Sequence, residues 1–163
     1  MNYTTYEELH NLIKSILDDN YAIAAANIVY LEELTKTSYV IYMTQFRDIL
    51  THLSHIYEID NLFEEDKKTA VLSQLERIKG HLERVVIDSF QKICGCHLQT
   101  IEESVQPKEW PALKTQIAQQ IRDLRISKPD INSLSFNDKK ENFQKLIEYM
   151  ESIINKFQLT FTE

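Results

Sequence analysis

Four side chains that can carry chemistry stand close together in the segment FRDILTHLSHIY, residues 46–57. They are Arg47, Asp48, His52 and His55. An imidazole has an ordinary pKa of about 6.5, so a histidine can take up or give a proton near neutral pH. A guanidinium can hold two oxygens of an anion with paired donors. The segment therefore predicts acid–base chemistry beside a bound anion.

These residues fall on one predicted helix, residues 38–59, whose apolar stripe we expect to face the core. That stripe consists of Phe46, Ile49, Leu50, Leu53 and Tyr57. At about 100° per residue, Arg47 and His52 leave the helix about 140° apart, so a straight helix does not bring them together. Both can line a groove formed with a second surface, or they can approach each other if the helix bends.

A second polar group lies on the next predicted helix, which runs from about Glu64 to the Cys-Gly-Cys sequence or a little beyond. Arg77, His81, Arg84 and Asp88 share one flank of it, at spacings of four, three and four. This flank can form the basic wall of a phosphate-binding groove beside helix 38–59. Alternatively, it is an ordinary surface on which Arg84 pairs with Asp88 along the helix.

Two arrangements of metal-ligating residue types occur. Asp48, His52 and His55 stand at i, i+4 and i+7, and such a set can ligate Zn²⁺ or Fe²⁺. These residues point away from the expected core, whereas metal sites of helical bundles lie inside it. Cys94 and Cys96 form a C-x-C pair, which alone cannot complete a tetrahedral zinc site, and we expect reduced thiols. We therefore assign no metal and no other cofactor.

The composition indicates a soluble domain built from helices. Of 163 residues, 43% are hydrophobic and 26% charged, and only two are glycine and three proline. Strands and tight hairpins use more turn residues than this. The apolar runs are much shorter than the ~20 residues of a membrane span. The start, MNYTTYEELH, does not resemble a signal peptide, so we expect a cytoplasmic protein with no membrane partner.

Charge is distributed unevenly along the chain. The net charge is −7, and residues 1–35 carry one lysine against six acidic residues, which gives −5 of it. A protein that coats nucleic acid without sequence preference needs a net positive surface. The net charge of this chain therefore excludes that class of function. A local basic site on an acidic protein is compatible with this distribution.

The pattern of apolar residues and helix breakers predicts a single all-α domain, an up-and-down bundle of five to six helices. Counting six, the expected helices cover residues 4–17, 21–35, 38–59, 64 to about 96, 110–126 and 138–158. The Asp18-Asp19-Asn20 sequence, Pro107 and the segment 127–130 separate helices in this reading.

Two predicted helices carry regular apolar stripes. The stripe of helix 64–96 alternates steps of four and three residues, which suits a partner helix crossing at about 20°; it consists of Val71, Leu75, Ile78, Leu82, Val85 and Ser89. The stripe of helix 138–158 consists of Phe143, Leu146, Ile147, Met150, Ile154 and Phe157. We expect both stripes in the core.

The order Arg47, polar Asp48, three further residues and His52 resembles the R-x4–6-H motif of the HEPN superfamily. The run ERIKGHLERVVIDSF, residues 76–90, is similar to the long helix that follows this motif in several such proteins. The resemblance covers about residues 20–95. Residues 98–163 would then be additional helices of the same bundle.

The resemblance implies a small helical domain, commonly dimeric, that acts as a metal-independent endoribonuclease in toxin–antitoxin or phage-defence systems. Arg47 would bind the phosphate, His52 would act as acid and base, and Asp48 would orient His52. The accessory residues would be Thr51, His55, Arg77, His81 and Arg84. Because acid and base catalysis needs two groups, a homodimer would bring a second Arg47 and His52 into one cleft. RNA and an antitoxin or other protein are the expected partners.

Two alternatives stay open. The polar residues around His52 also fit the ordinary solvated face of a helix. A helical interaction module with the same fold and a vestigial Arg–His motif would explain the sequence without any catalysis.

Overall fold

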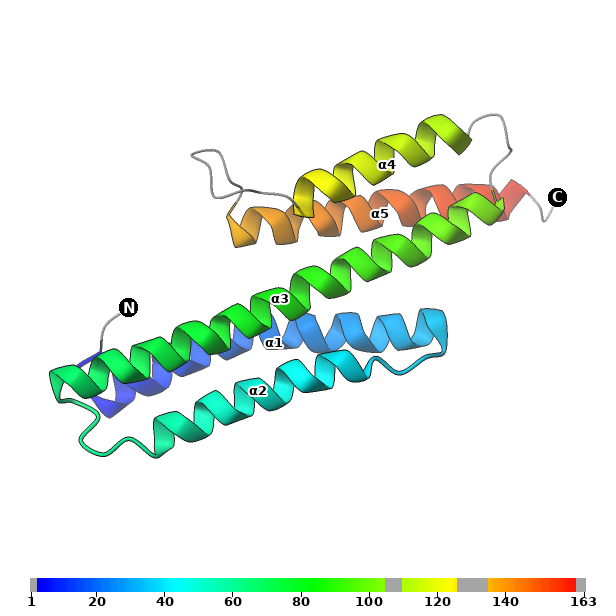
Figure 1. The fold of residues 1–163 in the computed structure, drawn as a ribbon. Helices are drawn as coiled ribbons and strands as arrows, with labels where there is room; N and C mark the ends of the chain where they lie inside the picture. Colours follow the sequence, from blue (N-terminus) through cyan, green and yellow to red (C-terminus); the bar gives the residue numbers. More distant parts are fainter. Residues whose placement is uncertain (1–2, 105–109, 126–134, 161–163) are drawn as a thin grey trace. The chain divides into compact units, whose positions relative to one another are not determined.

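The computed structural model describes residues 3–104, 110–125 and 135–160. These residues form five helices and no strand (Figure 1): α1 Tyr6–Thr35, α2 Val40–Tyr57, α3 Glu65–Ser104, α4 Trp110–Arg125 and α5 Phe136–Thr160. The predicted all-α helical bundle is confirmed. The chain divides into two compact units, residues 1–86 and 87–163, and α3 begins in the first and ends in the second.

Helix α1 begins with a capping box. The backbone N–H of Glu8 donates to Thr5 Oγ1 at 3.2 Å, and the Thr5 N–H donates to Glu8 Oε2 at 3.2 Å. This reciprocal pair satisfies N–H groups that have no partner within the helix. It makes Thr5 the N-cap, so that the helix begins at Tyr6.

The predicted break at Asp18-Asp19-Asn20 is wrong, because α1 continues through it as one helix of 30 residues. Asp18 lies on the exposed side and pairs with Lys14 at 2.8 Å, one turn earlier. Asn20 is buried, and the apolar stripe resumes beyond it with buried Ala24, Ile28 and Leu31. Packing along this stripe keeps the helix intact across residues that favour helix ends in isolation.

The core of the first unit lies where α1, α2 and the first half of α3 meet (Figure 1). The predicted stripe of α3 is confirmed, since all six of its members are at most 1% exposed. The buried cluster consists of Tyr3, Leu9, Ile16, Ile49, Ile56, Val71, Leu75, Ile78 and Leu82. Tyr3 also donates its hydroxyl hydrogen to the Leu62 carbonyl at 2.8 Å, which ties the start of the chain to the α2–α3 connection.

The predicted core stripe of α2 is partly wrong. Leu50 and Tyr57 are 65% and 81% exposed, whereas Ile56 is 1% exposed. The buried direction of the helix passes through Ile49 and Ile56, seven residues apart. Relative to the prediction, α2 is rotated so that Gln45 and His52 flank its buried side and Leu50 turns toward solvent.

The second unit contains the end of α3, α4 and α5 (Figure 1). Phe90 stacks on Phe143, with ring centroids 5.9 Å apart. The predicted α5 stripe is buried from Phe143 to Ile154; the side chain of Phe157 lies outside the described residues. Helix α5 is capped by Ser135, whose hydroxyl accepts from the Asp138 N–H at 3.2 Å.

The proposed breaks at Pro107 and residues 127–130 fall outside the described parts of the chain. None of the helices in the described ranges has the length and apolar character that crossing a membrane requires.

Candidate active site: a pair of histidines

His52 of α2 and His81 of α3 lie next to each other in the first unit. Their ring centroids are 5.3 Å apart and the ring planes are inclined by 31°. Both side chains are half-buried. The two residues are 29 positions apart in the sequence, and the antiparallel run of α2 and α3 brings them together (Figure 1).

Each histidine is held by a glutamine from the opposite helix. His52 Nδ1 lies 2.8 Å from Gln74 Oε1, and His81 Nδ1 lies 2.8 Å from Gln45 Oε1. On both helices the glutamine precedes the histidine by seven residues. Two Gln-x6-His segments therefore run in opposite directions, and the glutamine of each one hydrogen-bonds the histidine of the other. Both rings are thus fixed by the same kind of bond.

These hydrogen bonds determine where the ring hydrogens lie. A carboxamide oxygen can only accept, so Nδ1 of each histidine donates the hydrogen. In the neutral ring, the lone pair is then on Nε2. Both histidines of the pair thus present Nε2 as a base, and either can become an acid after taking up a proton.

Burial and nearby charges tune His81 in particular. Its pKa is lowered from the ordinary value, first by loss of water on burial, then by the charge of His52 and of Arg84. The carboxylate of Asp48 acts in the opposite direction. His81 therefore stays neutral, and able to accept a proton, at a lower pH than an exposed histidine does.

Arg47 and His52 are not brought together. The Arg47 side chain is 73% exposed and lies against Asp48, with Nη2 3.5 Å from Oδ1. The residue that orients His52 is Gln74, while Asp48 pairs with Arg47 and acts to raise the pKa of His81. In an isolated chain, the predicted Arg–Asp–His set is thus spread around α2.

The remaining predicted residues lie at the surface. Thr51, His55, Arg77 and Arg84 are exposed. Thr51 donates its hydroxyl hydrogen to the Arg47 carbonyl at 3.0 Å, and the His55 ring lies 6.4 Å from that of His52. Among the described residues, no group of three or more His, Cys, Asp or Glu is gathered as a metal-ligand set, and this includes the stripe through Asp48, His52 and His55.

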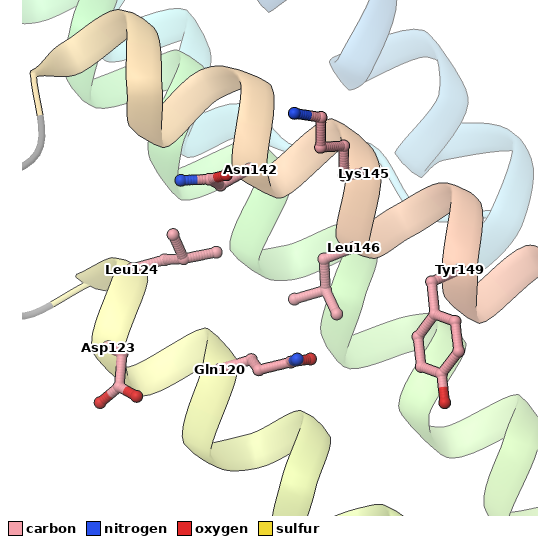
Figure 2. A pocket seen from close by; sticks show the side chains of 7 residues that line it. All are labelled: Gln120, Asp123, Leu124, Asn142, Lys145, Leu146 and Tyr149. Carbon is pink, nitrogen blue, oxygen red and sulfur yellow. The ribbon is translucent and has the colours of Figure 1, made fainter.

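A hollow of about 350 Å³ lies between α4 and α5 (Figure 2). Gln120, Asp123 and Leu124 border it from α4, and Asn142, Lys145, Leu146 and Tyr149 from α5. Asp123 accepts a hydrogen bond from Gln119, and Lys145 pairs with Glu141, each along its own helix. Because its two charged groups are engaged in this way, the hollow offers a polar surface but no acid–base pair.

Sequence reasoning placed His81 among the accessory residues and missed both glutamines. The signal was present as the repeated Gln-x6-His spacing, Gln45 to His52 and Gln74 to His81. A seven-residue spacing keeps both residues of each segment on one helix face, because two turns of helix contain about 7.2 residues. Its meaning emerges only when the antiparallel register of α2 and α3 is known.

Comparison of the chain with protein-family models, with curated proteins and with solved structures finds no match.

Proposed function

We propose that this chain is a metal-independent endoribonuclease in which His52 and His81 act together as acid and base. The observation that carries the proposal is the contact between the two rings, whose centroids lie 5.3 Å apart. Cleavage of RNA by its own 2′-hydroxyl needs one group to remove a proton and another to supply one. The two histidines provide both groups within a single chain.

In the proposed reaction, His81 Nε2 accepts the proton of the 2′-hydroxyl as that oxygen attacks phosphorus. The bond from phosphorus to the 5′-oxygen breaks, and His52, initially protonated on Nε2, gives its proton to that oxygen. The products are a 2′,3′-cyclic phosphate and a free 5′-hydroxyl. The lowered pKa of His81 favours its role as the base, and two like charges in contact disfavour a doubly protonated pair.

Cations near the pair can hold the phosphate. Arg84 is exposed and close enough to His81 to lower its pKa. A guanidinium placed there would stabilise the charge that develops on the phosphate oxygens. Arg47, which pairs with Asp48 on the outer side of α2, would contact the RNA backbone farther from the scissile bond.

The test is cleavage of a labelled RNA in excess chelator by the wild type, His52→Ala and His81→Ala. Each substitution is expected to lower the rate by about 10²–10⁴-fold, the usual contribution of general acid–base catalysis. Circular dichroism must show that each variant stays helical. His10→Ala is the matched control, because this exposed histidine lies on α1, outside the pair, and its loss should leave the rate within a few-fold.

Within this proposal, the chain would act as a toxin–antitoxin or phage-defence effector of the HEPN type, with an antitoxin as its protein partner. The paired histidines of one chain remove the need for a second copy to supply the acid. A homodimer stays a prediction, and in this scheme it would add Arg47 of the second copy to the RNA-binding surface.

A non-catalytic interaction module is the second candidate, and the exposed apolar side chains of α2 favour it. Val40, Ile41, Met43, Leu50 and Tyr57 are 58–81% exposed on a helix of 18 residues. Exposed apolar side chains gathered on one element commonly mark an interface. A wild-type protein that cuts none of the RNAs offered would favour this candidate.

A further inference from the structure

An open apolar groove runs between α1 and α2 of the first unit. Its volume is about 580 Å³. Four of its large apolar side chains are mostly exposed: Tyr21 at 53%, Val29 at 56%, Met43 at 58% and Leu50 at 65%. Such side chains lose contact with water only if something covers them, and each one covered contributes favourably to binding.

The shape of the groove suits a helix. Along α2, buried Ile49 lies at the floor of its lining. The other four lining residues, Met43, Phe46, Leu50 and Leu53, form a row that exposed Tyr57 continues. The steps are three, four, three and four residues, which is the spacing of one side of a coiled-coil seam. A third helix with apolar residues at the same spacing could lie along α1 and α2 at a shallow crossing angle.

Charge around the groove indicates which kind of helix would bind. Glu32 is the charged residue among those that line it. Residues 1–35, which include all of α1, carry a net charge of −5. Their single lysine, Lys14, is already paired with Asp18 at 2.8 Å. A helix with Lys or Arg beside its apolar stripe therefore complements this surface, whereas the same acidic α1 of a second copy would repel it.

We propose that the α1–α2 groove binds an amphipathic helix of a partner protein, with apolar residues at three- and four-residue steps and basic residues on the flanks. This binding does not depend on the histidine pair. At about 100° per residue, Leu50 and His52 leave α2 about 160° apart, so the groove and the pair occupy opposite flanks of the helix.

The probe is a fluorescent 18-residue helical peptide of leucine and lysine, with leucine at the heptad positions of a coiled-coil seam. Fluorescence anisotropy should show saturable binding to the full chain with a micromolar Kd. A peptide with glutamate in place of lysine should bind at least tenfold more weakly. Leu50→Glu should weaken binding of the lysine peptide tenfold or more. Ile41→Glu is the matched control, because Ile41 is equally exposed, at 69%, but lies on the other flank of α2; it should bind as the wild type does.

Equal binding by Leu50→Glu and Ile41→Glu would overturn the proposal, as would absence of binding. Sedimentation equilibrium addresses the remaining occupant: a wild-type dimer that Leu50→Glu converts to monomer would mean that a second copy covers the groove, and the proposal would be wrong. Circular dichroism checks the fold, and Met43→Glu repeats the test if Leu50→Glu is not helical. Because RNA cleavage is not measured, failure here leaves the nuclease proposal untouched.

Discussion

His52 and His81 face each other across α2 and α3 with their ring centroids 5.3 Å apart, and each is fixed by a glutamine that belongs to the other's helix. The charge of His52 is one of the causes that lower the pKa of His81, because like charges at this distance disfavour each other. A pair in which one ring is protonated and the other is neutral can supply an acid and a base in the same reaction step.

The charges beside His81 should shift its pKa in opposite directions. Arg84 lowers that pKa and Asp48 raises it. Arg84→Gln is therefore expected to raise the pKa of His81, and Asp48→Asn to lower it further. NMR titration of the imidazole resonances measures both shifts without any substrate. Shifts of the same sign in both variants would contradict the placement of these groups around His81.

The two glutamines should act as positioning residues. Gln74→Leu and Gln45→Leu each remove an acceptor from the Nδ1–H of one histidine, so that the ring can turn and the other tautomer becomes accessible. We expect RNA cleavage to fall about tenfold or more, in the range found when orienting partners are lost. Gln91→Leu, a half-buried glutamine on the same α3 helix but outside the pair, is the control.

A positioning role has its own signature in the NMR spectrum. In the wild type, the nitrogen shifts of both histidines should report hydrogen on Nδ1. Each leucine substitution should move only the histidine it contacts toward a mixture of tautomers. A rate loss with unchanged tautomers in both rings would count against this role.

Burial of His97 should make stability depend on pH. Its pKa is lowered from the ordinary 6.5 because burial outweighs the opposing charge of Glu151, which lies 3.5 Å away. The unfolded chain then takes up the proton more readily than the folded one. The stabilisation from neutral His97 is present above pH 6.5 and is lost as the pH falls below that value toward the folded pKa.

Urea midpoints of the wild type and His97→Gln at pH 7.5, 6.5 and 5.5 test this expectation. The wild type should lose stability across that range, and the variant should lose less, although His81 adds to the trend in both proteins through its own lowered pKa. Parallel decreases in the two proteins would show that His97 does not titrate in this way.

The two glycines of α3 offer a test of its continuity. A Cβ added at Gly80 or Gly95 would have open space, with no heavy atom within 4 Å. Alanine is favoured over glycine inside a helix by about 1 kcal/mol. Gly80→Ala and Gly95→Ala should therefore each raise the free energy of unfolding by about 0.5–1 kcal/mol. Destabilisation by either alanine would indicate that α3 is interrupted at that glycine.

The sequence predicted α3 well and α1 and α2 less well, for physical reasons that differ. The α3 stripe is regular over six positions and fully buried, so period and structure agree. The Asp18-Asp19-Asn20 sequence resembles a helix end locally, but packing of the flanking apolar residues decides the outcome. In α2, apolar residues occupy more than one face of the helix. The sequence alone does not tell which of these residues are buried in the core and which stay exposed along the groove.

For the candidate site, the sequence singled out the two segments but not the contact between His52 and His81. The sequence indicated His52 as catalytic and His81 only as accessory. The reason is that residue spacing along one helix carries no information about contacts between two helices. Gln45 and Gln74 are ordinary helix residues until the antiparallel register pairs them with the histidines. Arg47 was predicted from its position five residues before His52 in the sequence. On a helix, this spacing directs the two side chains to different flanks of α2.

The most direct test of the account is the fate of a single labelled RNA in excess chelator, compared with the same sequence made of 2′-deoxynucleotides. The proposed chemistry predicts that the RNA is cut to fragments ending in a 2′,3′-cyclic phosphate, and that the deoxy strand, which lacks the attacking hydroxyl, stays intact. Cleavage of both strands, or of neither, would contradict the assignment of His52 and His81 as an acid–base pair for RNA.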